Sequence, residues 1–182
     1  AAYAGDFTCV ATNSAGSATS APATISFDFT GLVNLSARAN VGTGANVVIP
    51  GITLRGTKPK TLLIRAVGPT LASFGLAGTL ANPTVTVFDS ANQPVLVNDD
   101  WGKVPDITAL KSASAAQGAF ALADGSRDAA LITTLPPGGY TIQVAGLGTG
   151  TATTGVALVE VYELDATPTT LVNLSCRANL GT

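Results

Sequence analysis

The chain has 182 residues, 46% of them hydrophobic and 11% charged, with a formal net charge of -2. This length suits one domain of ordinary size plus a smaller piece, and the low charge leaves no basic surface for a nucleic acid. No apolar run is long enough to insert into a membrane, and the lack of histidine rules out a Ser–His or Cys–His pair, so we predict neither an enzyme nor a bound cofactor.

The first element in chain order is a predicted β-hairpin over residues 5–20, with a turn at Asn13–Gly16. Its sequence, GDFTCVATNSAGSATS, resembles the last two strands of an intermediate-type immunoglobulin domain. In this resemblance Cys9 takes the place of the second core cysteine, and Phe7 takes the place of the corner tyrosine. The resemblance implies a partial immunoglobulin-like hairpin over residues 1–28. Because two strands alone are marginally stable, we expect this hairpin to need partner strands.

Residues 29–168 alternate short β-rich runs with Gly, Pro, Asn and Asp turns, which predicts an all-β, jelly-roll-like sandwich. The segment 107–117 is Ala-rich and follows a Pro-Asp pair, which predicts one short helix, with an ordered loop as the alternative. The eight predicted strands of the sandwich are 32–41, 45–52, 60–67, 84–88, 94–98, 128–134, 139–145 and 156–164.

A combination of motifs in this main domain resembles a repeat unit of very large secreted proteins from verrucomicrobial and planctomycete-like bacteria. The LPPGGYTIQV stretch is also similar to jelly-roll domains that lie beside secreted bacterial peptidases. These resemblances imply an extracellular or cell-surface β-sandwich, in tandem with immunoglobulin-like units and without enzymatic activity. The motifs are KTLLIRAVGPTL (60–71), VFDS (87–90), NDDWG (98–102), DAALITTLPPGGYTIQV (128–144) and GVALVEVYELD (155–165).

The last predicted element is a repeat of the first strand of the sandwich. Residues 171–182 (LVNLSCRANLGT) copy residues 32–43 (LVNLSARANVGT) with two substitutions. We therefore expect residues 169–182 to be the first strand of a further repeat, available for donation to another sheet. The alternative is that a longer tandem array was cut here. Strand alternation predicts an inward face made of Val172, Leu174, Cys176, Ala178 and Leu180.

Cys9 and Cys176 belong to no CxxC motif, which leaves either a disulfide or two buried free thiols. Our hypothesis is that strand 171–182 adds to the hairpin and that a Cys9–Cys176 disulfide locks the contact. If the two ends belong to neighbouring molecules, the contact is head-to-tail and builds a filament from copies of the chain. The other residues of this predicted interface are Phe7, Val10, Val172, Leu174, Ala178 and Leu180.

Asp89, Asp99 and Asp100, together with Asn98, form the best group of oxygen ligands, and a hard cation such as Ca2+ would suit them. Asx turns are the alternative for these residues. Trp101 lies beside them and is either a platform for stacking a sugar or a core anchor. The residues would then bind calcium or an extracellular polysaccharide.

Two arginines, Arg38 and Arg65, lie on predicted strand faces. Either could pair with Glu160 or with Asp residues, but we expect solvated charges at both positions.

The sequence thus predicts a structural subunit of an extracellular bacterial fibre or surface assembly, with copies joined head-to-tail by strand complementation. The alternative is a calcium- or carbohydrate-binding adhesion module within a giant secreted repeat protein.

Overall fold

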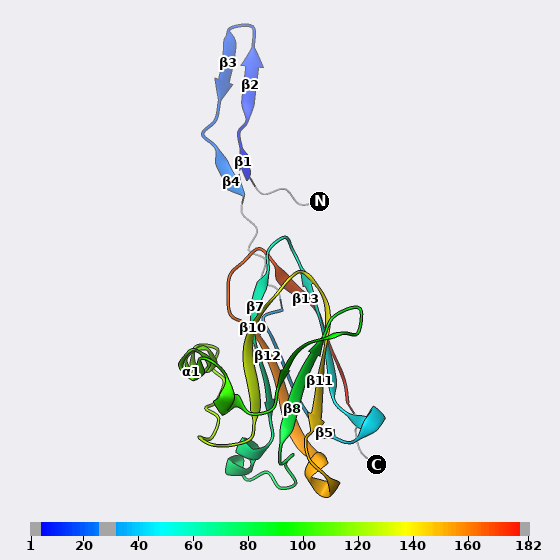
Figure 1. Ribbon diagram of the computed structural model, residues 1–182. Helices are drawn as coiled ribbons and strands as arrows, with labels where there is room; N and C mark the ends of the chain where they lie inside the picture. Colours follow the sequence, from blue (N-terminus) through cyan, green and yellow to red (C-terminus); the bar gives the residue numbers. More distant parts are fainter. Residues whose placement is uncertain (1–4, 26–31, 179–182) are drawn as a thin grey trace. The chain divides into compact units, whose positions relative to one another are not determined.

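The computed structural model describes residues 5–25 and 32–178 (Figure 1). The chain divides into two compact units, Ala1–Thr30 and Gly31–Thr182. Among the described residues, every strand pairs within its own unit.

The first unit is an antiparallel β-ribbon in which β1 pairs with β4 and β2 pairs with β3. The predicted turn forms because the side chain of Asn13 accepts a hydrogen bond from the N–H of Ala15 at 2.8 Å. All side chains from residue 5 to residue 24 are exposed, so the ribbon has no core of its own. Its strands are β1 (Gly5–Phe7), β2 (Val10–Asn13), β3 (Gly16–Thr19) and β4 (Ala23–Ile25).

The second unit is a β-sandwich of two antiparallel sheets. The four-stranded sheet has the order β10-β7-β12-β5, and the five-stranded sheet has the order β13-β6-β11-β8-β9. Apart from the β8–β9 hairpin, each strand lies in the sheet opposite its predecessor, which is the jelly-roll-like arrangement expected. The strands are β5 (Asn34–Val41), β6 (Ile49–Arg55), β7 (Lys60–Val67), β8 (Pro83–Phe88), β9 (Pro94–Asn98), β10 (Ala129–Leu135), β11 (Gly138–Gly146), β12 (Gly155–Glu163) and β13 (Thr170–Arg177).

One α-helix, α1, packs outside the four-stranded sheet, against β10 and β7 (Figure 1). The helix begins where predicted, because the side chain of Asp106 accepts a hydrogen bond from the N–H of Ala109 at 2.8 Å. The helices are η1 (Gly44–Asn46), η2 (Pro69–Phe74), η3 (Trp101–Lys103), α1 (Ile107–Ala116) and η4 (Gly150–Thr153). The predicted strand 45–52 was placed too early, since η1 occupies its first residues and β6 starts at Ile49.

Two apolar clusters hold the sandwich together. The main core lies between the sheets, and a second cluster lies between the outer face of the four-stranded sheet and the helices and loops that cover it. Burial of these side chains is the main favourable contribution to folding. The largest fully buried apolar residues are Trp101, Leu62, Leu63, Ile64, Leu80, Leu110, Ile142 and Leu171.

The segment predicted to be available for donation is already a strand of this sandwich. β13 pairs antiparallel with β6, with Cys176 opposite Pro50. Its first residues are fixed on one side because Glu163 Oε1 accepts the N–H of Leu171 at 2.8 Å, and Leu171 is only 1% exposed. The predicted boundary at residue 169 is therefore wrong for the described part of this segment. Leu180 lies outside the described residues.

Candidate assembly surfaces

The two copies of the repeated strand form the edges of opposite sheets on one side of the sandwich. β5 closes the four-stranded sheet and β13 closes the five-stranded sheet, and an isolated antiparallel bridge joins Leu32 to Leu171 where the copies begin. Apart from this bridge, no strand among residues 5–25 and 32–178 pairs with the outer edge of either. Strand edges with free N–H and C=O groups are sites where another strand can add.

The hydrogen bonds of β5 show which backbone groups face its neighbour β12. The C=O of Val33 accepts the N–H of Glu163 at 3.0 Å, and Ala37 lies opposite Val159. Because bonded and non-bonded pairs alternate along an antiparallel ladder, every second residue from Val33 points its N–H and C=O toward β12. The residues between them point their backbone groups to the free edge; these are Asn34, Ser36, Arg38 and Asn40.

The hydrogen bonds of β6 show that in β13 the other set of residues in the repeat faces the free edge. Val48 exchanges both backbone hydrogen bonds with Val144 at the β11 side, so the odd-numbered residues of β6 face β13. Gly51 is one of them, and it lies opposite Ser175. Asn173, Ser175 and Arg177 therefore bond to β6, whereas the N–H and C=O groups of the alternate residues point to the free edge. Within β13 those residues are Leu174 and Cys176.

Near-identical strands thus use opposite edges in the two sheets. Leu174, Cys176 and Ala178 correspond in the repeat to Leu35, Ala37 and Ala39. In β5 all three positions bond to the neighbouring strand β12, whereas in β13 the groups of Leu174 and Cys176 are free. The backbone edge that is free in β13 is therefore the same edge that bonds to β12 in β5.

Side chains on this edge leave the core incompletely covered. Leu174 and Ala178 are partly buried and pack against the main core. Cys176 lies between them on the same face of the strand but is exposed, and Val172 is 38% exposed. Partial burial still raises the pKa of the Cys176 thiol, so the group is protonated at neutral pH.

The ribbon presents a second set of free edges and uncovered apolar side chains. Phe7 is 46% exposed and Val10 is 59% exposed. Both backbone groups of Cys9 bond to Ser20, at 2.9 Å each, so they face the opposite arm of the ribbon. The groups of Val10 and Thr12 point to the outer edge of β2 as a result. Cys9 and Cys176 are both free thiols, and the predicted disulfide stays a prediction.

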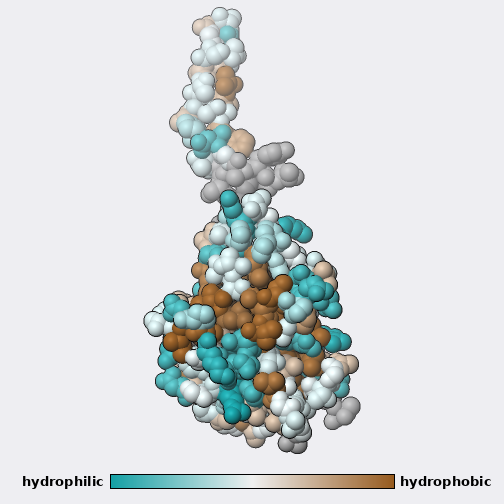
Figure 2. All heavy atoms as spheres, viewed as in Figure 1, coloured by the Kyte–Doolittle hydropathy of each residue, from teal (hydrophilic) through white to brown (hydrophobic). Residues whose placement is uncertain are grey.

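An apolar groove that the sequence analysis did not identify lies on the side of β9 and β10. Figure 2 shows apolar residues gathered there, beside α1. Val97 is 66% exposed, Val95 is 43% exposed and Ile132 is 36% exposed. The only sequence signal is the run PVLVN, which is apolar on both faces of the strand. Residues that line the groove include Leu96, Val104, Leu110 and Leu131.

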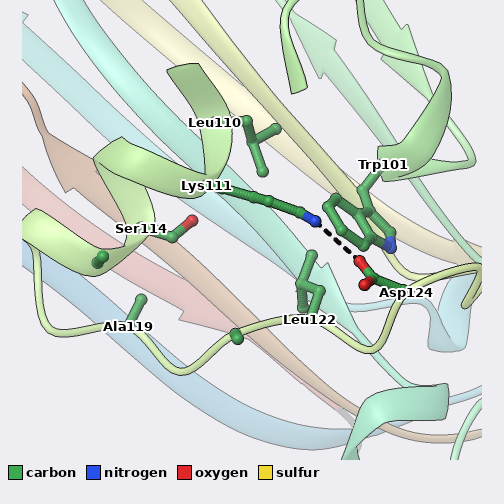
Figure 3. Close-up of a pocket in the computed structure, with 9 residues that line it drawn as sticks. Trp101, Leu110, Lys111, Ser114, Ala119, Leu122 and Asp124 are labelled. Atoms are coloured by element: carbon green, nitrogen blue, oxygen red, sulfur yellow. Dashed lines mark hydrogen bonds and ion pairs between the residues drawn. The ribbon is translucent and has the colours of Figure 1, made fainter. Parts of the chain in front are cut away.

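Trp101 is a core anchor and not a surface platform. It is 2% exposed, and its indole N–H donates to the hydroxyl of Ser126 at 3.0 Å. Figure 3 shows the Lys111 side chain reaching toward the indole ring; its Nζ lies 5.3 Å from the ring centroid and pairs with Asp124 at 2.8 Å. The small pocket beside the ring is lined by side chains of α1 and of the loop after it, both apolar ones such as Leu110 and Leu122 and polar ones such as Ser114. The predicted sugar-stacking role is wrong, because a buried ring cannot stack on a polysaccharide.

The predicted calcium ligands are not brought together. Asp89 lies before β9 and accepts the N–H groups of Ala91 and Gln93 at 2.9 Å each, which is an Asx turn. Asp99 and Asp100 lie after β9, and Asp100 pairs with Lys103. A full strand separates the two ends of this group. No three His, Cys, Asp or Glu residues in the described ranges are arranged to hold a metal ion.

Buried polar groups hold the covering layer onto the four-stranded sheet. Arg65 is fully buried and pairs with Glu160 at 3.2 Å, so the expectation of a solvated charge is wrong for this residue. Burial lowers the pKa of Arg65, while the nearby Glu160 opposes this shift. Asp128, also fully buried, accepts the N–H of Gly68 at 2.8 Å and the hydroxyls of Ser126 and Thr70. These contacts stabilise the fold.

No protein-family model matches the sequence, and no curated protein is significantly similar to it. None of the helices in the described ranges has the length and apolar character needed to cross a membrane.

Proposed function

We propose that this chain is a structural subunit of an extracellular bacterial fibre or surface assembly, in which copies are joined head-to-tail by strand complementation. The observation that carries the proposal is the free edge of β13, whose twin in β5 accepts a strand.

The ribbon is the complementary part of the proposal. A ribbon of two strands is marginally stable in water, and its Phe7 and Val10 side chains gain cover only if a further surface meets them. The edge of β13 lacks a strand and leaves Leu174 partly uncovered. If the ribbon of one molecule pairs with β13 of the next, the ribbon gains a partner strand and β13 gains cover for Leu174.

The composition and the sequence resemblance support an extracellular place for such an assembly. Only 11% of the residues are charged, so copies can approach with little electrostatic repulsion. The resemblance to secreted repeat proteins implies the same compartment, where a disulfide would persist.

Sedimentation velocity and electron microscopy of the full chain over a wide concentration range test this function. We expect species larger than the monomer that grow with concentration, and elongated particles at the highest concentrations. A chain that stays monomeric throughout, under both oxidising and reducing conditions, would contradict the proposal.

The alternative adhesion function loses its two specific supports. Trp101 is buried, and Asp89 is separated from Asp99 and Asp100 by the length of β9.

A further inference from the structure

We infer that the ribbon of one molecule adds to the free edge of β13 of another through its β2 strand, and that the two strands run parallel, with Cys9 directly beside Cys176. The inference rests on the proposed self-assembly and names its acceptor edge, its donor strand and their direction.

The acceptor edge follows from the backbone groups of β13. The N–H and C=O of Leu174 and Cys176 point away from β6, so two successive bonding positions of β13 are free. This edge carries no proline and no lysine, the residues that commonly block strand addition. β9, at the other end of the sheet, is shorter and begins with Pro94.

The donor strand follows from the exposed ribbon and the position of the thiols. β1 ends at Phe7 and β2 begins directly after Cys9, so both residues lie on the same arm of the ribbon. Cys9 and Cys176 are the chain's two cysteines. Cys176 lies in β13 and Cys9 immediately precedes β2, and both are exposed.

The direction follows from the hydrogen-bonding pattern of the two cysteines. Cys176 points its backbone groups to the free edge, whereas Cys9 points its groups to Ser20 and away from the outer edge of β2. In an antiparallel ladder, residues directly opposite each other either both bond across it or both point away. Cys9 and Cys176 therefore cannot be opposite partners in an antiparallel ladder. In a parallel ladder a residue that bonds lies beside one that points away, which fits this pair.

The side chains also match in the parallel arrangement. With Cys9 beside Cys176, alternation places Phe7 beside Leu174 and Ala11 beside Ala178. Phe7 would then cover the flank of the main core that Leu174 leaves open. Neighbouring strands lie about 4.8 Å apart, which is within the Cα separation that a disulfide requires.

The disulfide forms by exchange with a small-molecule disulfide such as oxidised glutathione. One protein thiolate attacks the oxidant to give a mixed disulfide, and the second protein thiolate displaces the remaining glutathione. The two protein thiols lose two protons and two electrons in total, and the oxidant is reduced to two thiols.

The experiment compares the full chain with a variant that moves one thiol by a single residue, Cys9→Ser combined with Val10→Cys. Each protein is concentrated in a glutathione redox buffer, separated on a non-reducing gel and digested for disulfide mapping by mass spectrometry. Mixing chains labelled with 14N and 15N distinguishes links between molecules from links within one. We expect a ladder with mixed-label Cys9–Cys176 peptides in the unaltered chain, and at least a tenfold lower yield in the shifted variant.

Three results would overturn the inference. A higher yield in the shifted variant would show an antiparallel junction, because Val10 bonds outward as Cys176 does. Cys9–Cys176 peptides that carry one label only would place the bond within a chain. Val97→Ser is an exposed control at the other end of the sheet. Loss of cross-linking in this variant would show that the ribbon binds to the groove beside β9 and not to β13. In each case self-association measured by sedimentation in reducing buffer still tests the proposed function by itself.

Discussion

Ala37 and Cys176 hold the same position in the two copies of the repeated strand, yet their backbones face different surroundings. Ala37 lies opposite Val159 and bonds to β12, whereas Cys176 lies opposite Pro50 and points its N–H to a free edge. One strand sequence therefore serves two sheets through opposite edges.

This difference makes proline a test of the assigned edges. Proline lacks the backbone N–H, so Ala37→Pro removes a hydrogen bond to β12 and leaves an acceptor unpaired. We expect a loss of about 1–3 kcal/mol in the free energy of unfolding, measured by urea denaturation. Cys176→Pro removes an N–H that no described strand uses, and should change the monomer by no more than about 0.5 kcal/mol while reducing self-association. Cys176→Ser is the control for loss of the thiol. Equal destabilisation by the two prolines would show that the edges are wrongly assigned.

Asp128 should be among the most sensitive polar residues of the sandwich. Its carboxylate accepts hydrogen bonds from Gly68, Thr70 and Ser126, all inside the protein. Asp128→Ala leaves these donors without a partner and should cost at least about 3 kcal/mol in thermal or chemical unfolding. The matched control is Asp124→Ala, because Asp124 is 84% exposed and pairs only at the surface. A similar stability for both variants would refute the assigned role of Asp128.

The buried pair of Arg65 and Glu160 gives a second prediction about stability. Glu160→Ala leaves the Arg65 guanidinium buried without its carboxylate, which should cost about 3–5 kcal/mol. The aromatic ring of Phe120, 4.9 Å from the guanidinium carbon, compensates for little of this loss. Denaturant midpoints of the variant and the unaltered chain provide the measurement, and a change below about 1 kcal/mol would mean that Arg65 reaches solvent.

Stability should fall at alkaline pH through Tyr162. Burial, followed by the hydrogen bond from its hydroxyl to Glu160 at 2.7 Å, raises the pKa of Tyr162 to about 12. Because the folded pKa lies above the unfolded value near 10, the neutral side chain contributes its full stability below about pH 10. That contribution is lost as the pH rises toward 12. Unfolding curves from pH 8 to pH 12 should therefore fall less steeply for Tyr162→Phe than for the unaltered chain. Parallel curves would show that Tyr162 titrates normally.

Most of the sandwich could be predicted because its strands alternate in polarity between clear turn residues. The strands at 60–67 and 94–98 were predicted with the bounds that β7 and β9 have. The start of β6 was missed because the Ala-Asn segment before it folds as η1. Local patterns define a strand well but define its first residue poorly.

The candidate sites could not be predicted in full, because they depend on which strands pair and on which distant segments cover a residue, and a local sequence pattern does not contain this information. The repeat predicted a second copy available for donation to another sheet, but this copy, β13, pairs with β6 of its own sandwich. The burial of Arg65 depends on a covering segment that includes Phe120, far away in the sequence. The separation of Asp89 from Asp99 likewise follows from the pairing of β8 with β9.

The pairing of β5 with β12 also bears on how the chain reaches this structure. β5 is the first strand of the sandwich to be synthesised, and its partner β12 follows roughly 120 residues later, so this contact forms late and slowly. During that delay the nascent strand remains open to capture by another unfinished chain, a route to misassembly. Rapid closure of β12 over β5 is then a requirement for a high yield of folded chain, and slow translation of the intervening segment should lower this yield.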